Sequence, residues 1–106
     1  MQENQIVVIC TAPDQAVGEH IAHALVTERL AACVNRVPGL VSTYRWQGKV
    51  EQAAECLLII KTSAARFEAV RERIKSLHPN ELPEIIALPI THGDSAYLKW
   101  ITENST

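Results

Sequence analysis

Cysteine and histidine are the residues of this 106-residue chain that could coordinate a transition metal, because thiolate and imidazole are ligands that copper and zinc favour. Cys10 ends a strand-like run, and His78 stands at the end of a helix-like segment. In a fold that sets these two segments side by side, their ends can approach the same edge of a sheet. Cys10 and His78 are therefore our candidate metal ligands. The alternative is a core thiol and a helix-end cation favoured by the helix dipole.

Three other histidines could also bind a metal. His20 and His23 are three residues apart in a predicted helix and could chelate an ion together, although such a pair on a polar helix face is more often only solvated. His92 follows Thr91 and precedes a Gly-Asp pair, and we interpret it as a loop residue.

A second group of residues could form contacts between copies of the chain. Tyr44 and Trp46 alternate onto one face of a predicted strand, and Glu51 follows on the return strand. Burial against another copy would remove these aromatic rings from water; a platform for a small ligand is the alternative. Lys61 and Glu84 lie beside apolar strands. They are either strand-end charges or a pair that holds a small polar or anionic ligand in a crevice between subunits.

A long β-hairpin over residues 40–62 must position these side chains. Its two strand-like runs, 40–46 and 49–62, meet at Gln47-Gly48, and Gly48 can adopt the positive φ that a two-residue turn needs. At ~3.3 Å per residue the second run would extend roughly 45 Å, whereas a compact domain of this size is about 35 Å across. The end of the hairpin therefore needs a cover from elsewhere.

The remaining segments complete a β-α-β-β-α-β order with a short helix at the end. Residues 5–11 are apolar on both faces, as in a central strand. A helix that Asp14 caps should run to about residue 30, and Thr62 and Ser63 should cap a second helix that ends at His78-Pro79. Each helix has an apolar stripe: Val17, Ile21, Ala24 and Leu25 in the first, and Phe67, Val70, Ile74 and Leu77 in the second. Residues 84–88 form a short strand, and residues 93–95 open the last helix.

This order predicts one domain over residues 1–106, an α+β ferredoxin-like sandwich with a long hairpin between its second and third strands. Right-handed crossovers place both main helices on one face of a four-stranded sheet. Strands that are apolar on both faces then need a cover on the other face. Association with further copies would cover both that face and the end of the hairpin.

Composition argues against several classes of function. Ten basic and twelve acidic residues give a net charge of −2, and aromatic residues make up 5%, so we expect no nucleic-acid partner. No apolar run is long enough to span a membrane, and the start of the chain lacks the features of a signal peptide. The four glycines are isolated and form no phosphate-binding loop. Three dispersed cysteines suit a reducing compartment, which predicts a cytoplasmic protein.

Motifs along nearly the whole chain resemble those of the CutA divalent-cation tolerance family. They are CTAP at 10–13, ERLAACVN at 28–35, Pro38-Gly39, SxYxWxGxxE at 42–51, His78-Pro79, PEII at 83–86 and GxxxYLxW at 93–100. The resemblance implies a homotrimer of ferredoxin-like subunits, similar to the PII signalling proteins, in which each hairpin extends a neighbour's sheet. It also implies Cu²⁺ binding at Cys10 and at histidines beside the His-Pro pair. Leu77 stands where some members have a second histidine, so we expect weak binding.

Two functions follow as expectations. The first is a non-enzymatic, homotrimeric protein of divalent metal-ion tolerance and homeostasis that binds copper or another divalent cation. The alternative is a PII-like trimeric sensor that binds a small metabolite in clefts between subunits. A mainly structural or anchoring module is what remains if neither kind of ligand binds.

Overall fold

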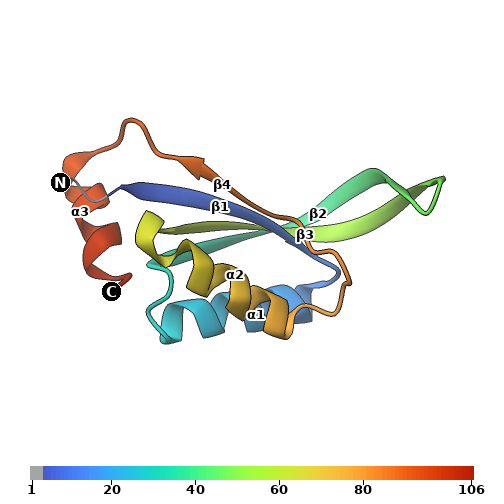
Figure 1. Cartoon of the computed structure of the whole chain (residues 1–106), viewed down its shortest axis with the longest axis horizontal. Coiled ribbons are helices and arrows are strands. Elements are labelled where there is room, and N and C mark those ends of the chain that lie inside the picture. Colours follow the sequence, from blue (N-terminus) through green and yellow to red (C-terminus); the bar gives the residue numbers. More distant parts are fainter. Residues whose placement is uncertain (1–3) are drawn as a thin grey trace.

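The computed structural model describes residues 4–106 as a four-stranded antiparallel sheet with three helices. The elements, in chain order, are β1 (Gln5–Ala12), α1 (Gln15–Thr27), β2 (Cys33–Trp46), β3 (Lys49–Ser63), a 3-10 turn (Ala64–Arg66), α2 (Phe67–Leu77), β4 (Ile85–Pro89) and α3 (Ser95–Glu103). The strand order is β2-β3-β1-β4. Figure 1 shows α1 and α2 on the same face of the sheet and α3 at the end opposite the hairpin tip. The predicted ferredoxin-like fold is confirmed.

The hydrophobic core lies between the sheet and helices α1 and α2. The apolar stripes predicted for the two helices supply its lower layer, in which Ile21, Leu25, Val70 and Ile74 are fully buried. Alternate residues of β1 and β3 supply the upper layer: Ile6, Val8, Cys10, Cys56, Leu58 and Ile60. Within residues 4–106 no helix is long and apolar enough to cross a membrane.

The other face of the sheet is also apolar but much less covered. Ile9 of β1 pairs with Ile86 of β4, and Val7 pairs with Leu88. Ile86 and Leu88 are 52% and 51% exposed, while Ile9 and Val7 are half-buried. The sequence predicted this open apolar face, because residues 5–11 are apolar in both alternating sets.

The hairpin extends beyond the rest of the molecule. β2 and β3 pair from Cys33 with Lys61 to Trp46 with Lys49, interrupted by a bulge at Pro38-Gly39. Gln47 and Gly48 have φ values of 51° and 80°, as the two central residues of a type I′ turn do. The molecule measures 45 × 26 × 23 Å, and its longest axis follows the hairpin (Figure 1). The predicted turn and the predicted overhang are both confirmed.

The ends of the helices differ from the prediction in two places. Thr62 and Ser63 do not cap α2. The Thr62 hydroxyl donates to the carbonyl of Leu30 over 2.7 Å, and the Ser63 hydroxyl shares a 2.7 Å hydrogen bond with Ser105. The cap prediction was wrong because these buried hydroxyls are satisfied by residues distant in sequence, and a 3-10 turn leads into the helix instead.

Helix α1 ends at Thr27, about one turn before the predicted end. Arg29 has a φ of 60°, and the amide of Leu30 donates to the carbonyl of Leu25, which is the pattern of a Schellman cap. The predicted cap at the other end is confirmed, since the amide of Val17 donates to the Asp14 carboxylate over 2.9 Å.

Candidate functional site

The structure brings Cys10 and His78 together at the carbonyl group of Thr11. Cys10 lies near the end of β1 with a fully buried side chain, and its thiol lies 3.7 Å from the Thr11 oxygen. His78 follows the last residue of α2, is 8% exposed, and places its Nε2 atom 2.7 Å from the same oxygen. One backbone oxygen therefore contacts both candidate ligands.

Both ring nitrogens of His78 have hydrogen-bond partners. Because the Thr11 carbonyl can only accept, Nε2 carries a proton and donates to it. The backbone amide of Asn80 donates to Nδ1 over 3.1 Å. Together these partners assign the neutral Nε2–H tautomer. A metal ion that binds either nitrogen must displace one of these two hydrogen bonds.

The Cys10 thiol is strongly held in its protonated form. Burial raises the pKa of Cys10 to about 12, and the negative charges of Glu84 and Glu55 contribute to this rise. A metal ion that coordinates the sulfur must therefore displace a tightly held proton. Within residues 4–106 no three side chains of His, Cys, Asp or Glu are arranged to hold a metal ion.

A pocket of about 560 Å³ opens between the outer half of the hairpin and the segment that leads from α2 to β4. The hairpin supplies Ser42, Tyr44, Arg45, Trp46 and Glu55, and the opposite wall consists of Thr11 and residues 80–84. The sequence singled out Tyr44, Trp46 and Glu84, but it did not indicate that they share one pocket.

Two other residues from the sequence analysis do not line this pocket. Glu51 pairs with Tyr44 across the hairpin and is exposed. Lys61 pairs with Val7 in the sheet and donates a hydrogen bond to the side chain of Asn35. Glu84 directly precedes Ile85, and Ile85 pairs with Cys10. Cys10 lies three residues further along β1 than Val7, the partner of Lys61. A single chain therefore does not bring Lys61 and Glu84 together.

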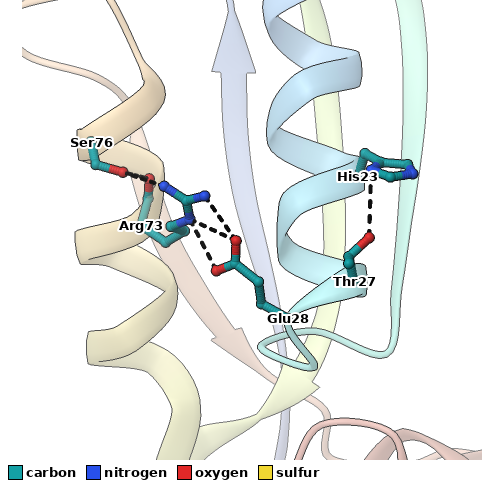
Figure 2. A network of polar contacts seen from close by, with 5 residues as sticks. All are labelled: His23, Thr27, Glu28, Arg73 and Ser76. Carbon is teal, nitrogen blue, oxygen red and sulfur yellow. Dashed lines mark hydrogen bonds and ion pairs between the residues drawn. The ribbon is translucent and has the colours of Figure 1, made fainter.

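The remaining histidines lie on the surface. His20 and His23 are both exposed on α1, and the Nδ1 atom of His23 lies 3.4 Å from the Thr27 hydroxyl. Figure 2 shows that His23 points away from the neighbouring ion pair of Glu28 and Arg73. His92 is exposed and contacts the hydroxyl of Thr91.

Sequence reasoning did not identify Thr11 and Glu55 as residues that line the pocket. It also did not identify the ion pair between Arg73 and Glu28. The Arg73 guanidinium binds both oxygens of the Glu28 carboxylate, at 2.8 Å and 3.0 Å for the shortest contacts, and joins α2 to the end of α1 (Figure 2). Glu55 pairs with Leu40 in the same uninterrupted register that pairs Tyr44 with Glu51 and Trp46 with Lys49, so its position near Tyr44 follows from the turn at Gln47-Gly48.

Comparisons with known proteins agree on one family. The sequence profile of the CutA1 divalent ion tolerance protein family matches residues 6–104. The chain is 54% identical over 99 residues to the divalent-cation tolerance protein CutA of Thermus thermophilus, covering 93% of this chain and 96% of that protein. It is 46% identical over 96 residues to an Escherichia coli protein of the same name, covering 91% and 86%.

Solved structures give the same result. The divalent cation tolerance protein of Thermus thermophilus superposes with a TM-score of 0.95 at 53% identity, over 96% of this chain and 99% of that one. A structure from Archaeoglobus fulgidus, described as a periplasmic divalent cation tolerance protein CutA, superposes with a TM-score of 0.93 at 38% identity, over 96% and 99%. The chain therefore belongs to the CutA1 divalent ion tolerance protein family.

Proposed function

We propose that this protein is a non-enzymatic, homotrimeric protein of divalent metal-ion tolerance that binds copper or another divalent cation through Cys10 and His78. The observation that carries the site is the convergence of both side chains on the Thr11 carbonyl. The relatives of this protein in Thermus thermophilus and Escherichia coli are named for divalent-cation tolerance, which supports a divalent cation as the ligand.

The surroundings of Cys10 and His78 determine how tightly a metal ion binds and how the affinity depends on pH. The thiol of Cys10 must lose its proton, and His78 must give up a hydrogen bond, so coordination competes with two existing interactions. Glu55 and Glu84 place negative charge near Cys10, and this charge attracts a cation. Weak binding that tightens as the pH rises is therefore the expected behaviour.

Trimer formation is supported by the surfaces that one chain leaves exposed. Ile86 and Leu88 lie on the open face of the sheet, and Tyr44 and Trp46 lie on the overhanging hairpin, 44% and 37% exposed. β2 and β4 are the two edge strands of the sheet, and their outer backbone groups can pair with another chain. A closed ring of three copies would use both edges and cover the apolar face.

We also propose a cytoplasmic location. All three cysteines are free thiols, and Cys10 and Cys56 are buried. Unpaired cysteines of this kind are usual in reducing compartments.

A metal titration tests the proposed site. The wild-type protein and the Cys10→Ala/His78→Ala double variant are titrated with Cu²⁺ by calorimetry, and with Co²⁺ to observe the charge-transfer absorption of a cobalt–thiolate bond. We expect the double variant to lose the binding heat of the wild type and the absorption band. The matched control is the His20→Ala/His23→Ala variant, which removes two exposed imidazoles and should bind as the wild type does. An unchanged isotherm in the Cys10→Ala/His78→Ala variant, with its fold verified by circular dichroism, would refute the site.

A further inference from the structure

The segment that leads from α2 to the edge strand β4, residues 79–84, is held by one hydrogen bond (Figure 1). The backbone amide of Asn80 donates to Nδ1 of His78 over 3.1 Å. Pro79 and Pro83 have no backbone N–H group to donate. Within residues 4–106 no other hydrogen bond and no ion pair involves this segment. The bond from Asn80 is therefore the polar contact that fixes the segment to the end of α2.

This bond requires His78 to keep an unprotonated Nδ1 atom. Nε2 donates to the Thr11 carbonyl over 2.7 Å, so the single proton of the neutral ring is on Nε2 and the lone pair of Nδ1 accepts from Asn80. A histidine that coordinates a metal ion does so through an unprotonated nitrogen, and the other ring nitrogen then carries the proton. The metal-free arrangement and the coordinated ring therefore make different demands on Nδ1.

Coordination through either nitrogen breaks the bond from Asn80. Coordination through Nδ1 uses the lone pair that accepts from the amide. Coordination through Nε2, which contacts the same carbonyl group as the Cys10 thiol, replaces the proton on Nε2 by one on Nδ1. The ring stays neutral in this exchange, and a coordinating Cys10 releases its own proton to water. Nδ1 is then a donor that faces the Asn80 donor, and two donors form no hydrogen bond.

We propose that metal coordination by His78 releases residues 79–84 from the end of α2, so that binding of a metal ion becomes movement of this segment. The inference rests on the proposed function, because it takes His78 as a ligand, and it adds a conformational response to that function. The bond to Thr11 is lost only when Nε2 coordinates, whereas the bond from Asn80 is lost in both modes. The segment is therefore the part of the chain that responds to the metal in either case.

Nuclear magnetic resonance of the full chain, with and without Zn²⁺, tests the release. Zn²⁺ is diamagnetic, so the signals of Asn80 and His78 stay visible when it binds. We expect Zn²⁺ to accelerate exchange of the Asn80 amide with solvent by about two- to tenfold, because the amide loses its hydrogen bond. The amide of Tyr97 is the internal control, since it donates to the Asp94 carboxylate over 3.0 Å on α3 and should exchange at its original rate.

Two substitutions at one position test the coupling in the opposite direction. Asn80→Pro removes the backbone N–H, and with it the bond that coordination must break, whereas Asn80→Ala keeps the N–H and changes only the side chain. We expect Asn80→Pro to bind Zn²⁺ about two- to tenfold more tightly than Asn80→Ala, because its binding no longer costs that bond. Circular dichroism checks that both variants fold. Equal affinities, or weaker binding by Asn80→Pro, would overturn the proposal.

The ring signals of His78 separate failure of this inference from failure of the proposed function. In the metal-free protein the nitrogen signals should show a protonated Nε2 and an unprotonated Nδ1, and Zn²⁺ should shift them. Ring signals that do not respond to Zn²⁺ would show that His78 is not a ligand, and both proposals would fail. If the ring signals shift but the Asn80 amide exchanges as before, only the release of the segment is refuted and the metal site stands.

Discussion

His78 donates a hydrogen bond from Nε2 to the backbone oxygen of Thr11 over 2.7 Å, and this contact fastens the end of α2 to the end of β1. The two residues are 67 positions apart in the sequence. His78 therefore has a structural role as well as its proposed role as a ligand.

Replacing His78 should destabilise the fold. His78→Ala leaves the Thr11 carbonyl and the Asn80 amide without their partners, and we expect the free energy of unfolding to fall by about 1–3 kcal/mol. Urea unfolding followed by circular dichroism measures this change. The control is His92→Ala, which removes an exposed imidazole and should change stability by less than about 0.5 kcal/mol. Equal stability of the two variants would show that the bond to Thr11 contributes nothing.

The raised pKa of Cys10 predicts a loss of stability at alkaline pH. The pKa of this thiol is 9.0 in the unfolded chain and about 12 in the folded protein, so the folded state retains a proton that the unfolded state releases. The contribution of the protonated Cys10 thiol to the free energy of unfolding is complete below pH 9.0 and is lost as the pH rises to about 12. Within that window the stability should fall by about 1.4 kcal/mol per pH unit on account of Cys10.

A comparison with Cys10→Ala isolates this contribution. Unfolding by urea is measured at several pH values above and below the ordinary pKa of a thiol, for both proteins. Lysines and tyrosines titrate in the same range, but they are common to the two proteins and cancel in the difference. The wild type should lose stability more steeply than Cys10→Ala, and parallel curves would show that the pKa of Cys10 is not raised.

The sequence predicted the fold well where the signals are local. The φ of Gly48, the cap at Asp14 and the alternating apolar residues of β1 each depend on a few neighbouring residues, and all three agree with the structure. The caps at Thr62 and Ser63 failed, because hydroxyl groups can bond to any nearby oxygen. Their actual partners are 32 and 42 residues away.

The candidate site was harder to predict than the fold. Cys10 and His78 could be placed at one edge of the sheet from topology alone, but their shared carbonyl could not. The pocket combines Glu55 with Glu84, and these two residues meet only through the pairing of β3 with β1 and of β1 with β4. A shift of one residue moves side chains to the opposite face, and so the membership of such a pocket follows only from the paired strands.

The turn of the hairpin should respond in opposite directions to two substitutions. Gln47 has a φ of 51°, a conformation that asparagine tolerates better, so Gln47→Asn should raise the free energy of unfolding by a few tenths to about 1 kcal/mol. Gly48 has a φ of 80°, so Gly48→Ala should lower it by about 1–2 kcal/mol. Thermal unfolding of both variants measures these shifts. A stabilising effect of Gly48→Ala would contradict the type I′ turn.

Trp46 should contribute to assembly of the proposed trimer. It is 37% exposed in one chain and lies next to the tip of the overhanging hairpin, so a neighbour that covers the tip would bury it further. Trp46→Ala should therefore dissociate into monomers at higher protein concentration than the wild type does, as measured by analytical ultracentrifugation. Glu51→Gln, in the facing strand, keeps the size of its side chain and provides a milder comparison. A Trp46→Ala protein that stays fully associated at the lowest measurable concentration would show that this ring does not hold the subunits together.

The ion pair of Glu28 and Arg73 should couple the two main helices by a modest amount. Its geometry is bidentate, with a shortest contact of 2.8 Å, but the side chains are 42% and 34% exposed and water screens their attraction. A double-mutant cycle with Glu28→Gln and Arg73→Gln should give a coupling energy of about 0.5–1 kcal/mol that shrinks in high salt.

Two controls assign this coupling energy to the contact between the helices. The pair of Lys99 and Glu103 on α3, 3.8 Å apart and more exposed, should give a smaller value in the same kind of cycle. Because Arg73 also contacts Ser76 on its own helix, the cycle is repeated in a Ser76→Ala background, where the coupling energy should be unchanged. A coupling energy of zero in both backgrounds would show that packing of the apolar stripes alone holds α1 and α2 together.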